Sequence, residues 1–211
     1  AFGNSLAVTI PAVAIPITVA AFAAYAFSWM DFRGRTFLFA VVVALIVVPL
    51  QMALIPILQI YNRFDITGTF PGLWLAHTGF GLPLAVYLLR NYMGSLPSSL
   101  VESAEVDGAD HWKIFTRLIL PLSTPVLAAF ATLQFLWVWN DYLVALIFIG
   151  VANRANNVLT VQLAGLAGQF GEGAVSLLPA AAFVTMIVPL VVFFALQRYF
   201  VRGLTAGSVK G

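Results

Sequence analysis

The sequence predicts an all-α membrane protein, and three observations carry that prediction. Of the residues, 62% are hydrophobic and only 9% are charged, whereas about a quarter of an ordinary soluble domain is charged. The apolar residues form long runs, and a helix of about 20 such residues crosses the hydrocarbon core of a bilayer. The strict alternation of a membrane barrel is missing, and open sheets leave backbone groups unsatisfied in lipid. We therefore expect one polytopic transmembrane domain over residues 1–211.

Five apolar runs are long enough to cross a bilayer as helices. They cover residues 6–29, 36–60, 70–90, 122–150 and 174–197. Basic residues follow the first, third and fifth runs, and those three places share one side of the membrane. The basic residues at these places are Arg33, Arg35, Arg90, Lys113, Arg117, Arg198, Arg202 and Lys210. Cytoplasmic loops are enriched in Lys and Arg, so we expect this side to be cytoplasmic. The loop 151–173 then faces outward.

This orientation places Ala1 on the external face, where the first run begins. Either a signal peptide has been removed, or an earlier helix that brings the chain across the membrane precedes Ala1. We expect the earlier helix, which makes six spans, of which five are visible.

A charged segment separates the third run from the fourth. Within residues 98–121, Ser99 and Glu102 have the spacing of a capping box, which predicts that a first short helix starts there. Asp107 and Gly108 break that helix, since Gly allows a sharp turn. Asp110 is suited to cap a second helix. We therefore expect two short helices joined at a corner, an elbow on the cytoplasmic surface.

The second helix of the elbow is amphipathic. Trp112, Phe115 and Ile119 fall on one apolar stripe, and we expect Leu120 and Pro121 to end the helix. An amphipathic helix that only rests on lipid is one interpretation, but it would present Lys and Arg to anionic headgroups. This elbow presents mainly carboxylates, those of Glu102, Glu105, Asp107 and Asp110. A protein partner fits this charge pattern better.

The elbow resembles the EAA motif, E-A-A-x3-G-x9-I-x-L-P, of permease subunits in bacterial ABC importers. Glu102, Ser103, Ala104, Gly108 and the segment 118–121 match it, with Ser103 in place of Ala and Leu118 in place of Ile. Further segments are similar to the maltose-type subgroup of carbohydrate importers. They are NSL at 4–6, FRGR at 32–35, GLPLAVYLLRNYMGSLP at 81–97, WND at 139–141 and the tail QRYFVRGLTAGSVKG at 197–211.

The resemblance implies a multi-pass subunit of the bacterial inner membrane whose elbow sits in a cleft of an ATPase. The implied coupling residues are Glu102, Ser103, Ala104, Asp107, Gly108, Ala109, Trp112, Phe115, Leu120 and Pro121. Gly108 would set the corner, Glu102 would bond to the ATPase, and the tail from Thr205 to Gly211 would reach it. The implied partners are two ATPase copies, a second, different permease and an extracytoplasmic sugar-binding protein. A disaccharide or oligosaccharide is the implied substrate.

Nothing in the sequence indicates catalysis by this chain. It contains no G-x-x-x-x-G-K-[ST] loop, so we expect ATP and magnesium on the partner ATPase and no cofactor here. The net charge of +2 is small and dispersed, which argues against nucleic acid. The chain has no cysteine, and no metal-ligand spacing stands out.

Polar side chains at membrane depth are candidates for a substrate pathway. They include His77, Gln134, Trp137, Asn140 and Asp141. For Gln134 the alternative is an interhelical hydrogen bond that serves packing. We expect His77 to be structural, since the sequence pairs it with no carboxylate or second His. Asp141, in WVWNDY, has amide and aromatic neighbours suited to sugar rings, but a helix-end or interfacial role is the favoured interpretation.

A secondary, ion-coupled transporter is the chief alternative. Such a protein would be expected to show paired broken helices in two related halves and several buried carboxylates. Apart from Asp141, the sequence offers neither. A membrane enzyme has less support, because no H-E-x-x-H motif or pair of intramembrane aspartates occurs.

Overall fold

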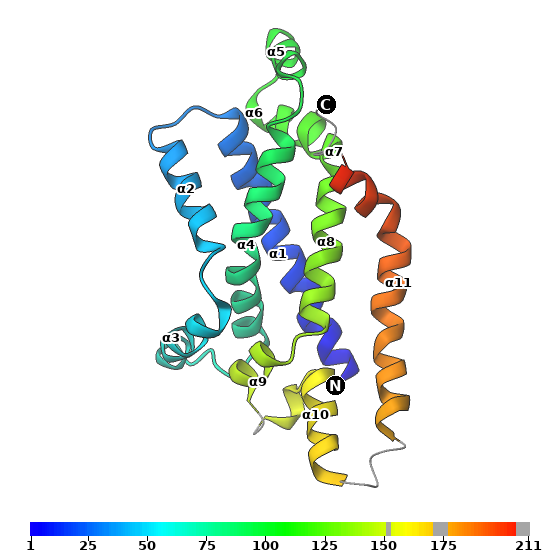
Figure 1. Cartoon of the computed structure of the whole chain (residues 1–211). Helices are drawn as coiled ribbons and strands as arrows, with labels where there is room; N and C mark the ends of the chain where they lie inside the picture. The colour runs from blue at the N-terminus through cyan, green and yellow to red at the C-terminus, as the bar shows by residue number, and fades with distance from the viewer. Residues whose placement is uncertain (151–152, 171–176, 206–211) are drawn as a thin grey trace. The chain divides into compact units, whose positions relative to one another are not determined.

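The computed structural model describes residues 1–150, 153–170 and 177–205. Every regular element within these ranges is helical, so the all-α prediction is confirmed (Figure 1). In chain order the elements are α1 Phe2–Trp29, α2 Arg35–Leu45, α3 Leu50–Arg63, α4 Phe70–Met93, α5 Ser98–Val106, α6 His111–Ile114, the π-helix η1 Phe115–Ile119, α7 Leu120–Leu122, α8 Thr124–Trp139, α9 Leu143–Ile149, the 3-10 turn η2 Arg154–Asn156, α10 Leu159–Phe170 and α11 Leu177–Thr205.

Three helices in the described ranges are long and apolar enough to cross a membrane unbroken. They are α1, α4 and the segment Pro179–Gln197 of α11. Two further spans are possible if each of two bent helix pairs, α2 with α3 and His111–Leu122 with α8, counts as one. The five apolar runs are therefore found as helices, but two of them are not single rods.

The predicted span 36–60 is wrong as a continuous helix. The chain leaves the helical conformation between α2 and α3, and Pro49 takes an extended conformation with ψ of 125°. Proline has no N–H to continue the helical hydrogen bonds, and it disfavours helix at the residue before it, here Val48. These local effects prevail over an apolar run that is long enough to span.

The predicted span 122–150 is also interrupted. The helix α8 ends at Trp139, and α9 starts at Leu143. The segment 151–173, which is predicted as an outward-facing loop, contains the helix α10. By contrast, α4 passes through Pro83 without a break. The start of the fifth predicted run, at 174–176, lies outside the described residues.

The chain divides into two compact units. The first comprises Ala1–Ile15, Val48–Phe80 and Thr132–Ala195, and the second comprises Pro16–Val47, Gly81–Ala131 and Leu196–Gly211. Their boundaries fall inside α1, α4, α8 and α11, so each of these helices contributes to both. The prediction of one transmembrane domain stays a prediction.

Each unit has its own buried core. In the first unit Phe148, Leu73 and Val144 pack around small residues such as Ala12. In the second unit, the large core residues include Leu89 of α4, Ile119 of the elbow, Phe130 of α8 and Tyr25 of α1. Alanines on α1, among them Ala20 and Ala24, are fully buried in this core. Small side chains let helices approach closely, which is the usual basis of helix packing in membranes.

Candidate functional site

The first helix of the elbow, α5, starts differently from its prediction. Its N-cap is Pro97, and no side chain caps it. The helix begins at Ser98, so Ser99 already lies in the first turn and cannot act as the cap. Its carbonyl accepts a hydrogen bond from the Ser103 hydroxyl at 2.7 Å. The predicted capping box of Ser99 and Glu102 is therefore wrong.

The corner of the elbow lies where the sequence places it. The helix α5 ends at Val106, and Gly108 follows with φ of +78°, in the left-handed region that favours glycine. The Gly108 N–H donates to the carbonyl of Glu105 at 3.0 Å, which closes the turn. A Cβ at Gly108 would meet no atom within 4 Å in this chain. The need for glycine here is therefore conformational.

The second half of the elbow starts with the predicted cap. The Asp110 carboxylate accepts a hydrogen bond from the Lys113 N–H at 2.8 Å and opens α6. The helical run does not end at Pro121, as predicted, but continues through η1 and α7 to Leu122. Pro121 falls at the first positions of α7, where proline is tolerated. The chain turns at Ser123, one residue before α8.

The predicted apolar stripe of this half is partly confirmed. Phe115 and Ile119 are buried in the core of the second unit. Trp112 is 63% exposed, although its ring stacks on Phe22 of α1 with centroids 6.2 Å apart. Phe22 and Tyr25 of α1, which contact the elbow, do not follow from the residue pattern of the elbow itself. Their i, i+3 spacing, which places both rings on one face of α1, is the signal that was available.

The exposed surface of the elbow is acidic and contains a cavity. The four predicted carboxylates, Glu102, Glu105, Asp107 and Asp110, are all exposed. Two of them, Glu102 and Asp107, line a cavity of about 330 Å³ together with Ser99, Ser103 and Val106. Val106 is 88% exposed, so an apolar side chain projects beside carboxylates. This combination is suited to a protein surface that offers an apolar contact and hydrogen-bond donors.

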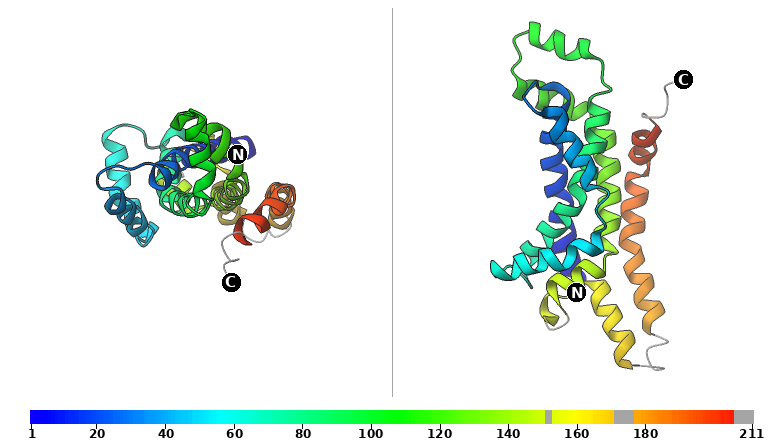
Figure 2. Two further views of the ribbon diagram at one scale, coloured as in Figure 1. Left: turned by 90° about the horizontal axis from the view of Figure 1, so that it is seen from above. Right: turned by 60° about the vertical axis from the view of Figure 1, so that its left-hand side comes forward.

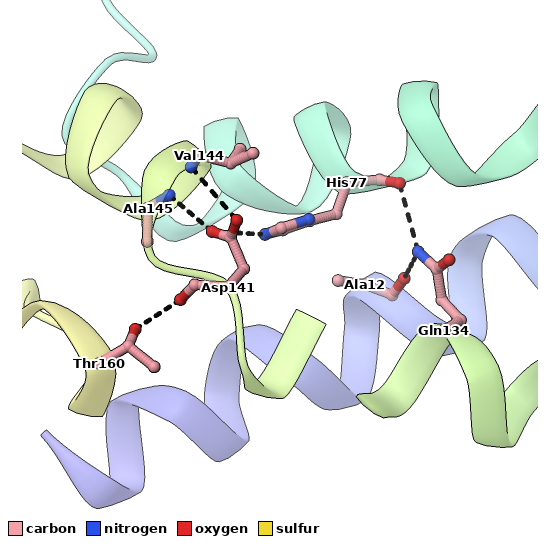
Figure 3. A network of polar contacts seen from close by, with 7 residues as sticks. All are labelled: Ala12, His77, Gln134, Asp141, Val144, Ala145 and Thr160. Carbon is pink, nitrogen blue, oxygen red and sulfur yellow. Dashed lines mark hydrogen bonds and ion pairs between the residues drawn. The ribbon is translucent and has the colours of Figure 1, made fainter. Parts of the chain in front are cut away.

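The first unit contains a separate polar cluster at His77 and Asp141 (Figure 3). The His77 Nε2 lies 3.8 Å from Asp141 Oδ2, and both side chains are more than nine-tenths buried. The expectation that no carboxylate accompanies His77 is therefore wrong, because the fold brings α4 to the segment after α8.

Asp141 ends one helix and starts the next. Its carboxylate accepts hydrogen bonds from the N–H groups of Val144 at 3.3 Å and Ala145 at 2.9 Å, in the first turn of α9. Its own carbonyl accepts a hydrogen bond from the Thr160 hydroxyl of α10. The helix-end role that the sequence favoured is confirmed, and it explains why the predicted span 122–150 is broken.

Gln134 joins three helices beside this cluster. Its Nε2 donates to the carbonyls of Ala12 and His77, each at 3.3 Å, and the side chain is buried (Figure 3). The predicted interhelical hydrogen bond is therefore present. Trp137 is 39% exposed. The exposed Asn140, which follows α8, donates to the carbonyl of Leu136 in the last turn of that helix at 2.7 Å. Of the five predicted pathway residues, only His77, Gln134 and Asp141 meet in this cluster.

Within the described residues, no group of three or more His, Asp or Glu side chains could hold a metal ion. Residues 206–211 of the tail, which are predicted to reach an ATPase, lie outside the described residues. Their role stays a prediction.

Comparison with known proteins identifies the class. Residues 7–206 match the family described as "Binding-protein-dependent transport system inner membrane component". This match covers most of the chain, which therefore belongs to that family: it is the permease component of an ABC importer.

Curated relatives support the same class. The chain is 60% identical over 210 residues to the osmoprotective compounds uptake permease protein GgtD of Synechocystis sp. This match covers 100% of the chain and 70% of the relative. The chain is also 60% identical over 215 residues to the alpha-glucoside transport system permease protein AglG of Rhizobium meliloti, covering 100% of this chain and 56% of that protein. The trehalose transport system permease protein SugB of Mycobacterium tuberculosis is 34% identical over 211 residues, 99% of this chain and 76% of the relative. The chain thus spans little more than half the length of AglG.

Two solved structures share the fold. One is a bacterial ABC transporter involved in the import of the acidic polysaccharide alginate, with a TM-score of 0.75 at 23% identity over 94% of this chain and 74% of that one. The other is a bacterial alginate ABC transporter in complex with an alginate pentasaccharide-bound periplasmic protein, with a TM-score of 0.76 at 16% identity over 94% of this chain and 76% of that one. At these identities the likeness concerns the fold.

Proposed function

We propose that this chain forms half of the translocation pathway of an ATP-driven carbohydrate importer and is moved by a separate ATPase at its elbow. The ATPase holds ATP and magnesium, and its closure displaces the elbow. The helices attached to the elbow convert that displacement into opening toward the other face of the membrane, a mechanism of alternating access.

The observation that carries this proposal is the surface of the elbow. Four carboxylates are exposed on it, and two of these, Glu102 and Asp107, line a cavity of about 330 Å³ together with Val106, 88% of whose surface is exposed. An amphipathic helix that binds lipid headgroups would be expected to present a basic face. The acidic surface and the exposed apolar side chain favour a protein, and in this family that protein is the ATPase.

The proposed assembly contains this chain, a second and different permease, two ATPase copies and an external binding protein. It lies in the bacterial inner membrane, with the elbow on the cytoplasmic side. Eight of the ten basic residues fall on that side of the predicted topology, which supports the orientation. The periplasmic protein in the complex with the alginate transporter supports the external partner by analogy.

A disaccharide or short oligosaccharide is the proposed substrate, because relatives carry alpha-glucoside and trehalose transport in their names. His77, Gln134 and Asp141 are occupied by contacts within the protein. Trp137 and Asn140 have exposed side chains, and an aromatic ring with an amide is suited to a sugar. These two are the residues of the predicted set that we propose for sugar contact.

The corner of the elbow gives a direct test, with the complex purified from cells that express all its subunits. Gly108→Val combines a β-branched side chain with a backbone in the left-handed region and should abolish uptake of labelled trehalose or maltose while the protein stays in the membrane. Gly108→Asn is the matched variant, since Asn populates this region. It should keep the corner and co-purify more ATPase than Gly108→Val. Normal uptake by Gly108→Val, or proton-driven uptake by this chain alone, would contradict the proposal.

A further inference from the structure

The second half of the elbow is packed against α1 through aromatic rings. Phe22 lies between two rings of the elbow: it stacks on Trp112, with an interplanar angle of 11°, and its centroid is 5.0 Å from that of Phe115. All three residues belong to the second compact unit. The elbow is thus in contact with a helix to which it is not directly joined in sequence.

Tyr25, one turn further along α1, adds a polar contact to this packing. Its ring centroid is 5.2 Å from that of Phe115, and its hydroxyl lies 2.9 Å from Nδ1 of His111, a residue 86 positions away in the sequence. The two atoms share a hydrogen bond whose donor depends on the tautomer of His111. Tyr25 itself is buried, with 5% of its surface exposed.

These two kinds of contact constrain the elbow differently. Aromatic pairs have preferred orientations but accept ring-centroid distances from about 4.5 to 7 Å, so aromatic contacts alone allow a helix to slide or rotate by a small amount. A hydrogen bond weakens steeply when its distance or angle changes, and it therefore fixes position and rotation together. His111 is the first residue of α6, directly after the Asp110 cap. The bond to Tyr25 consequently fixes the start of α6 on α1.

We propose that Tyr25 and His111 are positioning residues that make α1 move together with the second half of the elbow. This inference rests on the proposed function, in which an ATPase displaces the elbow. The covalent links of the elbow lead only to α4 and α8. The Tyr25–His111 bond gives the displacement a third route, into α1, without passing through either link.

The absence of cysteine from the chain makes a site-specific test possible. A single cysteine at Val19, which is 45% exposed on α1, can carry an environment-sensitive fluorophore. The labelled permease is assembled with its ATPase and second permease in lipid nanodiscs. Magnesium and a non-hydrolysable ATP analogue are then added, and the change in fluorescence is the response of α1.

In the parent complex we expect a nucleotide-dependent response, and Tyr25→Phe should reduce it at least about fivefold, the lower range of typical couplings between sites. Tyr25→Phe keeps the buried ring, so the amount of ATPase that co-purifies should not fall. Tyr87→Phe, the same change at a 38% exposed tyrosine of α4, is the matched control and should keep the full response.

His111, the exposed hydrogen-bond partner of Tyr25, supplies a second, independent pair of variants. His111→Ala removes the hydrogen-bonding atom and should reduce the response as Tyr25→Phe does. His111→Asn places an amide near the position of Nδ1 and should recover it. A purely structural role would change the yield of the complex and would not separate Ala from Asn.

The outcomes distinguish the inference from the function on which it rests. A parent complex that binds no ATPase, or gives no response to nucleotide, contradicts the proposed function. A responsive parent whose Tyr25→Phe and His111→Ala variants match Tyr87→Phe overturns the inference alone. Equal loss in His111→Ala and His111→Asn likewise overturns the hydrogen bond as its cause.

Discussion

The Nε2 atom of His77 lies 3.8 Å from Oδ2 of Asp141 in the interior of the first unit. The two side chains form an ion pair when His77 is protonated. The Asp141 carboxylate is held in place by two N–H groups of α9, so its position does not depend on His77. The helix cap thus positions the carboxylate of the pair. We expect the two capping hydrogen bonds to contribute more to the free energy of unfolding than the contact with His77 does.

The cap predicts a graded response to substitution of Asp141. Asp141→Asn keeps one acceptor for the α9 N–H groups and should lower the free energy of unfolding by about 1 kcal/mol, whereas Asp141→Ala should lower it by about 2 kcal/mol. Unfolding by SDS titration of the purified permease measures both. Asp65→Asn, the same change at an exposed turn residue, should have little effect. Equal stability of Asp141→Ala and the parent would refute the capping role.

Gln134 should contribute through its interhelical hydrogen bonds. Gln134→Leu retains most of the buried volume but loses the donor to the carbonyls of Ala12 and His77, so we expect a loss of about 1 kcal/mol. The same SDS titration detects this change. If Gln134 instead contacts substrate, the variant would keep its stability and lose uptake, a pattern opposite to the one expected.

Two glycines of α4 should differ sharply in their tolerance of alanine. A Cβ at Gly72 would collide with the carbonyl oxygen of Ile66 and would lie 3.4 Å from Thr69 Oγ1. Gly72→Ala should therefore destabilise the protein by about 2 kcal/mol, because a backbone atom cannot move aside without strain. Gly79→Ala meets no atom within 4 Å and should be neutral or slightly stabilising. Thermal unfolding in detergent compares the two variants, and equal melting temperatures would contradict this account.

The Asp110 cap should control the local stability of α6. Asp110→Ala removes the acceptor for the Lys113 N–H and should cost about 1 kcal/mol, while Asp110→Ser keeps an acceptor and should cost much less. Hydrogen exchange of the peptide that contains Lys113 is the measurement. Faster exchange in Asp110→Ala than in Asp110→Ser is the expected result; identical exchange in both would show that the cap is dispensable.

The sequence predicted those features whose cause lies within a few residues. The corner at Gly108 and the cap at Asp110 follow from backbone preference and from one side chain, and both are present. The capping box failed because α5 has Pro97 as its N-cap and starts two residues earlier than the motif requires. Contacts such as His77 to Asp141 join segments that only the folded chain brings together, and no local pattern signals them. The break before Pro49 has a local cause in the proline itself, which prevails over the length of the apolar run.

The π-helical winding of η1 has a consequence for how this elbow tolerates changes in length. The i→i+5 hydrogen bonds of Phe115–Ile119 take up one more residue than the corresponding turn of an α-helix. Deleting a single residue there would restore regular winding and leave the indole of Trp112 and the imidazole of His111 facing α1. Deleting Lys113 from the regular turn of α6 would instead rotate everything before it by about 100° and turn those two rings away from α1. A shortened chain is thus tolerated in η1 and not in α6, a difference that substitutions alone would never expose.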